Sequence, residues 1–395
     1  MTSIATYDVA VVGGGPAGAT AAHDLACKGH SVLLLDKAGR IKPCGGAIPP
    51  RLLRDFDIPQ SLLVAEIKGA GIVSHKGRRI EMPIEADGFV GMVDRGPFDA
   101  WLRARAVEAG ATLVDGSYHS LERDGAPGVV MVYRDRAKNE HRVRARVVIG
   151  ADGANSQVAR EIPGRGPKLV FAYHEIIRAP KGLGDARYEP QRCDVYYDGR
   201  ISPDFYGWIF PHGDTASVGV GSAHKGFGLR EATAELRAMS GLAECETIRR
   251  EGAPIPLSPR RTWDNGRDIV LAGDASGVVA PASGEGIYYA MYGGRVAADA
   301  VVRFLATGRA AELATARRTF MRAHGRVFAV LRVMQWFWYS SDSRRERFVT
   351  MCGDPDVQKL TWEAYMNKKL VKARPMAHAR IFAKDMAHLL GLVSP

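Results

Sequence analysis

The chain has 395 residues, of which 46% are hydrophobic, and a formal net charge of +11. That length and composition predict an ordinary globular enzyme with two or three domains. Its five cysteines are scattered without a C-x-x-C pair, which argues against a disulfide framework and indicates a reducing cytosol. Strand-like residues begin almost at once, so we expect no signal peptide, and no apolar stretch is long enough to span a bilayer.

Residues 7–36 have the pattern of one strand, helix, strand unit. The sequence Gly13-x-Gly15-x-x-Gly18 directly follows the first apolar run, and Asp36 ends the second. A tight glycine turn at a helix start presents backbone amides and the positive end of the helix dipole to a pyrophosphate. A carboxylate at the end of the second strand can accept hydrogen bonds from an adenosine ribose. This order of elements predicts a dinucleotide site without distinguishing NAD from FAD.

The rest of the chain alternates between strand and helix patterns. A loop with Lys42-Pro43-Cys44-Gly45-Gly46 precedes short strands over residues 66–93, a helix over 98–109 and strands over 129–149. From about residue 168 to 260 a period of two with many aromatics predicts an antiparallel sheet, a plausible substrate-binding layer. A buried strand at 268–271 and a helix from Gly286 to about Leu305 follow, and everything beyond is expected to be helical.

Two motifs in the middle of the chain select FAD. They are Gly150-Ala151-Asp152-Gly153-Ala154-Asn155-Ser156, and Val270-Leu271-Ala272-Gly273-Asp274-Ala275 followed by Pro281, Gly284, Glu285 and Gly286. Together they resemble the paired signatures of the para-hydroxybenzoate hydroxylase superfamily. In that superfamily the acid of the second motif, here Asp274, holds the ribityl chain of FAD, and the glycine-rich helix start lies beside the flavin ring, where it can stabilise negative charge.

Two further sequences narrow the resemblance to one family. Lys42-Pro43-Cys44-Gly45-Gly46-Ala47-Ile48-Pro49 and Pro203-x-x-Tyr206-x-Trp208-x-Phe210 look like the geranylgeranyl reductases, and the first is most similar to the chlorophyll and bacteriochlorophyll branch. The resemblance implies NADPH-linked reduction of a geranylgeranyl group to phytyl, on a pigment ester or on the free diphosphate, during pigment synthesis. The cofactor-binding residues expected from the motifs and the resemblance are Gly13, Gly15, Ala17, Gly18, Asp36, Lys37, Cys44, Gly45, Gly46, Arg95, Asp152, Gly273, Asp274, Gly284, Gly286 and Ile287.

The aromatic row suits the chemistry that the family implies. An isolated alkene has no carbonyl to polarise it, so an acid must protonate it before a hydride from the flavin completes the reduction. Tyr206, Trp208 and Phe210 alternate along a strand and therefore share one face, where they can bind an isoprenoid chain and stabilise a developing cation. We expect Tyr206 and Trp208 to act in catalysis and all three to bind substrate, although such residues also fill ordinary sheet cores.

Other side chains near these motifs have two interpretations each. By resemblance Cys44 lies near the flavin, where its thiol could relay a proton or only shape the pocket. Arg95 matches a site that binds flavin phosphates or polarises the ring in the wider superfamily, and it could equally cap the helix that follows. His174 and His212 have no metal-like spacing, and we treat both as ordinary; no metal site is predicted.

The positive charge is concentrated after residue 300, where 17 basic and 7 acidic residues occur. Such asymmetry indicates an anionic partner or a solvated helical face. We favour peripheral contact with an anionic photosynthetic membrane, without nucleic acid. The segment 327–339 and the cluster Arg344, Arg345 and Arg347 would meet the lipid interface. The alternative is that 327–339 is a buried helix over the substrate-binding sheet.

The expected fold is α/β: a Rossmann-like FAD-binding domain (1–65, 94–165 and 266–300), an antiparallel-sheet substrate domain (66–93 and 166–265) and a helical C-terminal region (301–395). The first rival function is an aromatic monooxygenase on the same fold. A flavin halogenase fits less well, because the Tyr206-Gly207-Trp208 string lacks its first tryptophan. A prenyl-binding escort protein without redox activity is the rival from another class, and the intact glycines and acids of the cofactor motifs argue against it.

Overall fold

The computed structural model describes residues 4–37, 39, 41–85, 88–180 and 188–368, and it divides into two compact units. The first unit contains residues 1–42, 95–169 and 254–325, and the second contains residues 43–94, 170–253 and 326–395. Each unit is therefore built from three separate stretches of chain. Residues 369–395, the end of the expected helical region, lie outside the described residues.

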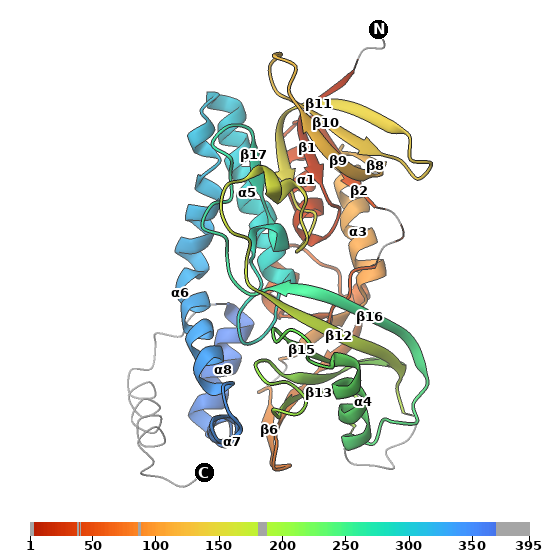
Figure 1. The fold of residues 1–395 in the computed structure, drawn as a ribbon, viewed down its shortest axis with the longest axis vertical. Coiled ribbons are helices and arrows are strands. Elements are labelled where there is room, and N and C mark those ends of the chain that lie inside the picture. Colours follow the sequence, from red (N-terminus) through yellow and green to blue (C-terminus); the bar gives the residue numbers. More distant parts are fainter. Residues whose placement is uncertain (1–3, 38, 40, 86–87, 181–187, 369–395) are drawn as a thin grey trace. The chain divides into compact units, whose positions relative to one another are not determined.

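A seven-stranded sheet forms the centre of the first unit (Figure 1). Four parallel neighbours, in the order β8 (Thr112–Asp115), β2 (Val32–Asp36), β1 (Ala5–Val12) and β11 (Glu140–Gly150), continue into the antiparallel strands β10 (Val129–Arg134) and β9 (Ser117–Glu122). The short strand β17 (Ile269–Leu271) pairs in parallel with the end of β11. Residues 9–12 of β1 and 32–35 of β2 are continuous buried apolar runs, as expected for strand segments covered on both faces.

Small residues let the helices of the first unit approach one another closely. Helix α1 (Pro16–Ala26) packs against α3 (Arg95–Glu108) and α5 (Ile287–Thr307). A Cβ atom at Gly294 of α5 would lie only 2.1 Å from the carbonyl oxygen of Ala17, and one at Gly273 would lie 2.6 Å from the Cβ of Ala17. Gly294 therefore lets α5 approach the start of α1 closely, and Gly273 does the same for the turn that begins at residue 273.

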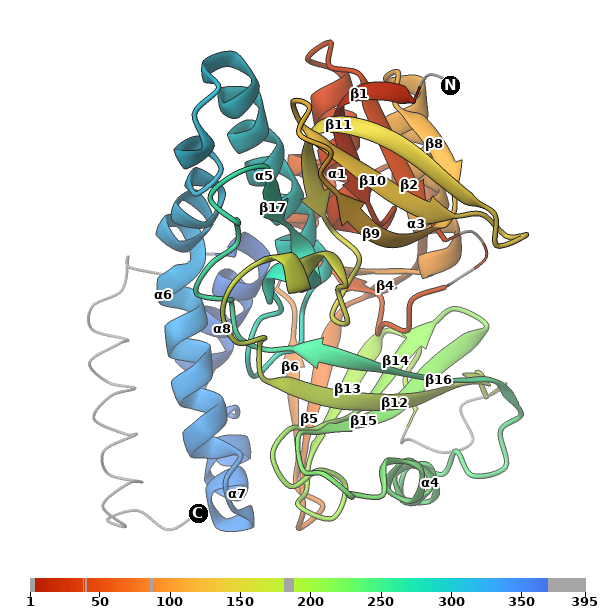
Figure 2. The ribbon, with the colours of Figure 1, turned by 45° about the horizontal axis from the view of Figure 1, so that its top comes forward.

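A second seven-stranded sheet forms the centre of the second unit (Figure 2). Its order is β16 (Thr247–Pro256), β12 (Leu169–Arg178), β15 (Thr215–Ser222), β14 (Gly207–His212), β13 (Arg192–Tyr197), β5 (Gly69–Ser74) and β6 (Arg79–Pro83). Neighbouring strands run antiparallel where their register is defined, except for the parallel pair β13 and β5. Helix α4 (Leu229–Met239), which the sequence pattern did not predict, covers one face of this sheet.

A small sheet and the C-terminal helices complete the second unit. The small sheet contains β3 (Ala47–Ile48), β7 (Val90–Val93) and β4 (Leu63–Ile67). Helices α7 (Asp342–Met351) and α8 (Pro355–Asn367) follow α6 (Thr315–Trp338), whose residues from Arg326 onward belong to this unit. The part of the chain that the structure describes also contains the short helix α2 (Pro50–Asp55) and four 3-10 turns, η1 (Gln60–Leu62), η2 (Val158–Glu161), η3 (Gly273–Ser276) and η4 (Ala310–Glu312).

The predicted α/β architecture is confirmed, and the boundaries of its parts differ from the expected ones. Residues 43–65 group with the second unit because β3 and β4 pair with β7. The described part of the expected C-terminal region, residues 301–368, forms no separate region, because the chain changes unit within α6. Within the described residues, no helix has the length and apolar character needed to cross a membrane.

Candidate active site

The start of helix α1 is built to receive an anion. Gly15 is the N-cap residue, with extended backbone (φ −76°) and no capping side chain, and Pro16 follows it at the first helical position. A Cβ atom built on Gly15 would meet no heavy atom within 4 Å. Amides at a helix start need partners, and here neither a side chain nor another segment fills the space that a side chain at Gly15 would enter.

The other two glycines of the fingerprint serve the turn itself. Gly13 has φ +104°, and a Cβ there would lie 2.4 Å from the carbonyl oxygen of Ala151. A Cβ at Gly18 would lie 1.8 Å from the carbonyl oxygen of Gly13. Backbone contacts of this kind leave no room for any side chain. Gly13 and Gly18 are thus required by the fold, whereas Gly15 is required only by what binds next to it.

Asp36 ends β2, as predicted, and its carboxylate is held by two groups. Oδ1 accepts a hydrogen bond from the amide of Gly14 at 2.9 Å, and Oδ2 lies 3.3 Å from Nη1 of Arg103. Arg103 also donates to the carbonyl oxygen of Gly14 at 3.2 Å. Sequence reasoning missed Arg103, because nothing in the helix pattern of residues 98–109 distinguishes it from other basic surface residues. Lys37, next to Asp36, is exposed.

The second glycine-rich motif places an acid beside another uncapped helix start. Asp274 is buried, and its carboxylate forms an ion pair with the ammonium group of Lys42. Gly286 is the N-cap of α5 and also has no capping side chain, and a Cβ there would lie 3.9 Å from Oδ1 of Asp274. Gly284, with φ +65°, makes the turn that leads into this helix, and Ile287 is its buried first residue.

These features of the first unit fit FAD. Its pyrophosphate can take the amides at the start of α1, its adenosine ribose can take Asp36, and its ribityl hydroxyls can take Asp274. The uncapped start of α5 can stabilise charge on a flavin ring. Two uncapped helix starts and two acids in one unit therefore match the polar groups of the cofactor that the motifs predict.

Asp152 and Arg95, two expected cofactor residues, have structural partners. The Asp152 carboxylate accepts hydrogen bonds from Ser156 Oγ at 2.5 Å and from the amide of Gln157 at 2.6 Å, so it holds the turn before η2. Burial raises the pKa of Asp152 above its ordinary value, and these hydrogen bonds oppose that effect. The buried Arg95 donates twice to Asp99, at 2.9 and 2.7 Å, one helical turn away.

In the second unit the three aromatic side chains of the predicted row lie together. The ring centroids of Tyr206 and Trp208 are 6.1 Å apart, and those of Trp208 and Phe210 are 6.3 Å apart. Ile209, between them in sequence, points into the core beneath α4 instead. Tyr206 and Trp208 are buried, and Phe210 packs against buried residues of the small sheet. One face of the large sheet is thus the core, and the other carries the aromatic row.

A chain of hydrogen bonds orients the indole of Trp208. Its Nε1 donates to Ser217 Oγ at 3.1 Å, and Ser217 Oγ lies 2.8 Å from Nδ1 of His174. The other nitrogen of His174 lies 3.1 Å from the carboxylate of Glu251. Burial would raise the pKa of Glu251, but the hydrogen bond to His174 and the charge of Arg249 outweigh it, so the pKa is lowered. We refer to Glu251, His174 and Ser217 as the Trp208 relay.

Glycine on the neighbouring strand makes room for this relay. Gly219 of β15 lies opposite both His174 and Trp208, and a Cβ there would be 2.4 Å from the Cβ of His174 and 2.5 Å from Cζ2 of Trp208. Val218 and Val220, its neighbours, point into the core beneath α4. The Val218-Gly219-Val220 pattern thus indicates a sheet face on which large side chains cover a glycine, and the sequence analysis did not use it. His174, for which no functional role was predicted, lies on that face.

Residues 43–46, which we call the Cys44 loop, pack on β14, the strand that carries Trp208 and Phe210. A Cβ at Gly45 would lie 2.9 Å from the ring of Phe210, and a Cβ at Gly46 would lie 2.5 Å from Cε1 of His212. The amide of Gly46 lies 3.4 Å from the sulfur of Cys44 and points toward it. Within the second unit, these glycines are explained by the approach of β14 side chains to the loop.

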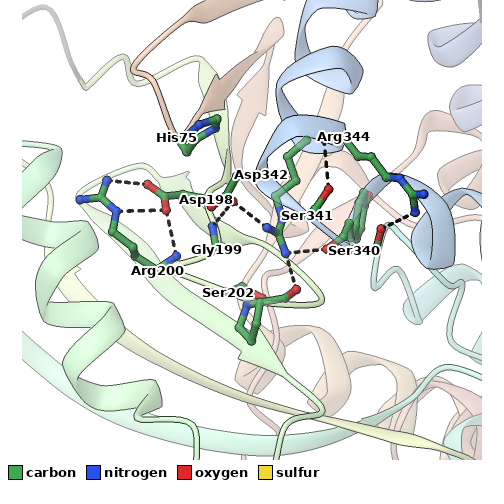
Figure 3. A network of polar contacts seen from close by, with 12 residues as sticks. His75, Asp198, Gly199, Arg200, Ser202, Ser340, Ser341, Asp342 and Arg344 are labelled. Atoms are coloured by element: carbon green, nitrogen blue, oxygen red, sulfur yellow. Dashed lines mark hydrogen bonds and ion pairs between the residues drawn. The ribbon is translucent and has the colours of Figure 1, made fainter. Parts of the chain in front are cut away.

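The C-terminal helices are fastened to the same sheet. Asp342, at the start of α7, accepts a hydrogen bond from the amide of Gly199 at 2.9 Å, and Ser341 caps the helix (Figure 3). Arg345 is 3% exposed and donates to Asp342 and to the carbonyl oxygens of Pro203 and Tyr339. Arg345 therefore holds α7 on the unit. The prediction that Arg345 binds lipid phosphates is wrong, because its guanidinium is buried and already bonded.

Comparison with known proteins gives a consistent picture. A family model described as an FAD binding domain matches residues 6–180. A protein of Rhodobacter capsulatus named geranylgeranyl diphosphate reductase is 60% identical over 390 residues, which cover 98% of this chain and 99% of that protein. A Synechocystis protein of the same name is 34% identical over 400 residues, covering 97% of each chain.

Solved structures share the fold. A geranylgeranyl bacteriochlorophyll reductase-like protein from Thermoplasma acidophilum superposes with a TM-score of 0.81 and 24% identity, over 95% of this chain and all of that one. A flavin-dependent brominase superposes with a TM-score of 0.73 and 20% identity, over 96% of this chain and 99% of that one. At such identities the likeness concerns the fold alone.

The first prediction separates binding from folding at the fingerprint. Gly15→Val adds a side chain where the protein has open space, so we expect a melting temperature close to that of the parent chain and loss of FAD binding in a flavin titration. Gly18→Val is the matched variant that should fail to fold, because its side chain meets the backbone of Gly13. A folded Gly15→Val protein that keeps its affinity for FAD would contradict the placement of the pyrophosphate.

Proposed function

The chain belongs to the geranylgeranyl diphosphate reductase family, and we propose that it uses FAD and NADPH to reduce a geranylgeranyl group to phytyl during chlorophyll or bacteriochlorophyll synthesis. Full-length similarity at 60% identity to the Rhodobacter capsulatus reductase is the observation that carries this proposal. The family reduces C=C bonds with FAD. NADPH as the electron donor, and a pigment ester or the free diphosphate as the substrate, are the parts that we infer.

In this proposal the first unit binds the cofactor. The amides at the start of α1 hold the pyrophosphate, Asp36 holds the adenosine ribose, and Asp274 holds the ribityl chain. Lys42, which forms an ion pair with Asp274, would share that carboxylate with the ribityl hydroxyl groups. Bound FAD, once reduced by NADPH, would supply a hydride.

The second unit would bind the prenyl chain and donate the proton that each reduced double bond gains. Each reduced double bond gains one proton and one hydride, and each consumes one NADPH. We assign the proton to the Cys44 thiol. Tyr206, Trp208 and Phe210 present ring faces that stabilise the cation formed after protonation, an interaction of about 0.5–2 kcal/mol per ring. The Trp208 relay keeps the indole in one orientation while the chain binds.

An anaerobic assay tests the function. The protein, FAD and NADPH are incubated with geranylgeranyl diphosphate in one arm and with geranylgeranyl bacteriochlorophyll in the other, and the chains are analysed by mass. We expect products two hydrogens heavier at each step, up to phytyl, in at least one arm. No hydrogenated product in either arm, with FAD bound and NADPH present, would contradict the proposal.

The second prediction concerns Trp208. Trp208→Ala should lower the rate of chain reduction about threefold to thirtyfold through lost cation stabilisation, with FAD content unchanged. Ser217→Ala removes the acceptor of the indole N–H but keeps the ring, so a smaller loss is expected. Ile209→Ala is the control on the opposite face: it should cost about 2–4 kcal/mol of stability and leave the rate of the folded protein unchanged. A normal rate of chain reduction in folded Trp208→Ala would show that Trp208 only packs in the sheet and does not contact the substrate.

We also propose that the second unit contacts an anionic membrane through α6. Phe328, Trp338 and Tyr339 are buried, whereas Val330, Val333 and Trp336 are 42%, 62% and 74% exposed. Helix α6 contains no acidic residue, and Arg326 and Arg332 are exposed near these apolar side chains. Apolar residues flanked only by positive charge suit the boundary between acyl chains and anionic headgroups. A peripheral location on the photosynthetic membrane would follow.

The third prediction tests this contact by vesicle co-sedimentation. The double variant Val333→Ser, Trp336→Ser should bind vesicles containing anionic lipid at least about tenfold more weakly than the parent, because each buried apolar side chain contributes roughly 1.5–3 kcal/mol. Ile248→Ser, which changes an exposed apolar residue on β16, is the control and should bind normally. Equal binding to neutral and anionic vesicles, or none to either, would contradict the proposal.

A further inference from the structure

His212, the last residue of β14, contacts the Cys44 loop at Gly45 and Gly46. The residue is only 8% exposed. Its Nε2 lies 3.1 Å from the carbonyl oxygen of Gly45, and its Nδ1 lies 3.2 Å from Oδ1 of Asp94. Gly46 has φ +72°, and the ring of His212 together with the carbonyl oxygen of Val93 fills the space where its Cβ would be. The imidazole therefore bridges the loop and the residue that follows β7.

Both ring nitrogens of His212 face groups that can only accept hydrogen bonds. A carbonyl oxygen has no proton to give, so Nε2 must carry a proton to bond Gly45. The hydrogen bond with His212 lowers the pKa of Asp94, and the charges of His212 and of Arg249 on β16 add to that effect while burial opposes it. The carboxylate is therefore ionised and also accepts. A neutral imidazole satisfies one partner and turns a lone pair toward the other. Only the doubly protonated ring satisfies both.

The loop that this ring holds carries the thiol assigned to catalysis. The carbonyl oxygen of Gly45 lies 3.1 Å from Nε2 of His212, and a Cβ on the same residue would lie 2.9 Å from the ring of Phe210. The next amide, that of Gly46, points at the sulfur of Cys44. Two contacts thus tie the loop to β14, and only one of them depends on a proton. When His212 loses one proton, the remaining N–H stays with the ionised carboxylate of Asp94, which is the stronger acceptor, and Nε2 turns a lone pair toward the carbonyl oxygen of Gly45. The loop then keeps its packing on Phe210 but loses its hydrogen bond to the ring.

We propose that doubly protonated His212, paired with Asp94, is a positioning residue that holds the Cys44 loop on the aromatic row, and that loss of one ring proton releases the loop. This inference rests on the proposed function for its meaning, because the loop matters only if Cys44 serves the reaction. Whether His212 holds the loop can be tested without that function, because the question concerns only one hydrogen bond and one charge in the second unit.

The test measures how fast iodoacetamide alkylates Cys44 in the FAD-loaded protein, followed by mass spectrometry of the peptide that contains it. No prenyl substrate or NADPH is present, so the result does not depend on whether the chain is a reductase. Parent protein and His212→Phe are compared at about pH 5 and about pH 8, on either side of the range in which histidine titrates. The ratio of the two rates removes the ordinary pH dependence of the thiol.

We expect His212→Phe to react about tenfold faster than the parent near pH 5, and the ratio to fall toward one as the pH rises and the parent ring loses its second proton. His224→Phe, an exposed histidine of the same unit, should give a ratio of one throughout. A ratio that stays constant with pH would overturn the proposal, since purely structural loss of the ring does not depend on its proton.

Asp94→Asn keeps the test decisive if His212→Phe does not fold. An amide oxygen can still accept from Nδ1, but the charge that favours the second ring proton is gone, so labelling of Cys44 should accelerate at a lower pH than in the parent. Long-range nitrogen–proton correlation by NMR provides the direct readout. Two protons on the His212 ring in the parent near pH 5 are expected, and a single proton there, or an unchanged labelling profile in Asp94→Asn, would refute the assignment.

Discussion

The start of helix α1 is the constraint on which the first unit depends. A helix leaves its first amides without intrahelical partners, and here no side chain caps them. To present those amides, β1 must end in a turn tight enough for Gly18 to touch the backbone of Gly13. Glycine on α5 must also let that helix approach Ala17. The buried strands and the small residues of α1 and α5 support this geometry, which leaves the first amides of α1 uncapped and the space beside Gly15 open.

The second unit depends on a different constraint, the division of one sheet into two unlike faces. Along β15, valines enter the core beneath α4 while Ser217 and Gly219 lie under Trp208. Because Gly219 has no side chain, two large rings can cross the strand and still reach a common hydroxyl group. The polar relay behind Trp208 is thus a consequence of where glycine occurs. Substrate contact and structural stability are assigned to opposite sides of the same strands.

Local patterns were sufficient to predict the strand, turn and helix of residues 7–36, the position of Asp36 and the shared face of the aromatic row. They could not reveal partners that are distant in the sequence. Lys42 contacts Asp274, which lies 232 positions away in the sequence, and Asp94 contacts His212, which lies 118 positions away. Nor does the sequence show which basic residues of the C-terminal region are buried. Arg345 is buried in the second unit, whereas Arg326 and Arg332 are exposed. Helix α4 escaped prediction because it interrupts a long alternating segment.

The central claim is that this chain transfers reducing equivalents from FAD to an isolated double bond. The most direct measurement mixes anaerobic protein containing photoreduced FAD with geranylgeranyl diphosphate or its bacteriochlorophyll ester and follows the absorbance of oxidised flavin in a stopped-flow instrument. The account predicts reoxidation without oxygen, with one double bond reduced for each flavin oxidised. Flavin that stays reduced with both substrates, and is reoxidised only when oxygen is admitted, would contradict it.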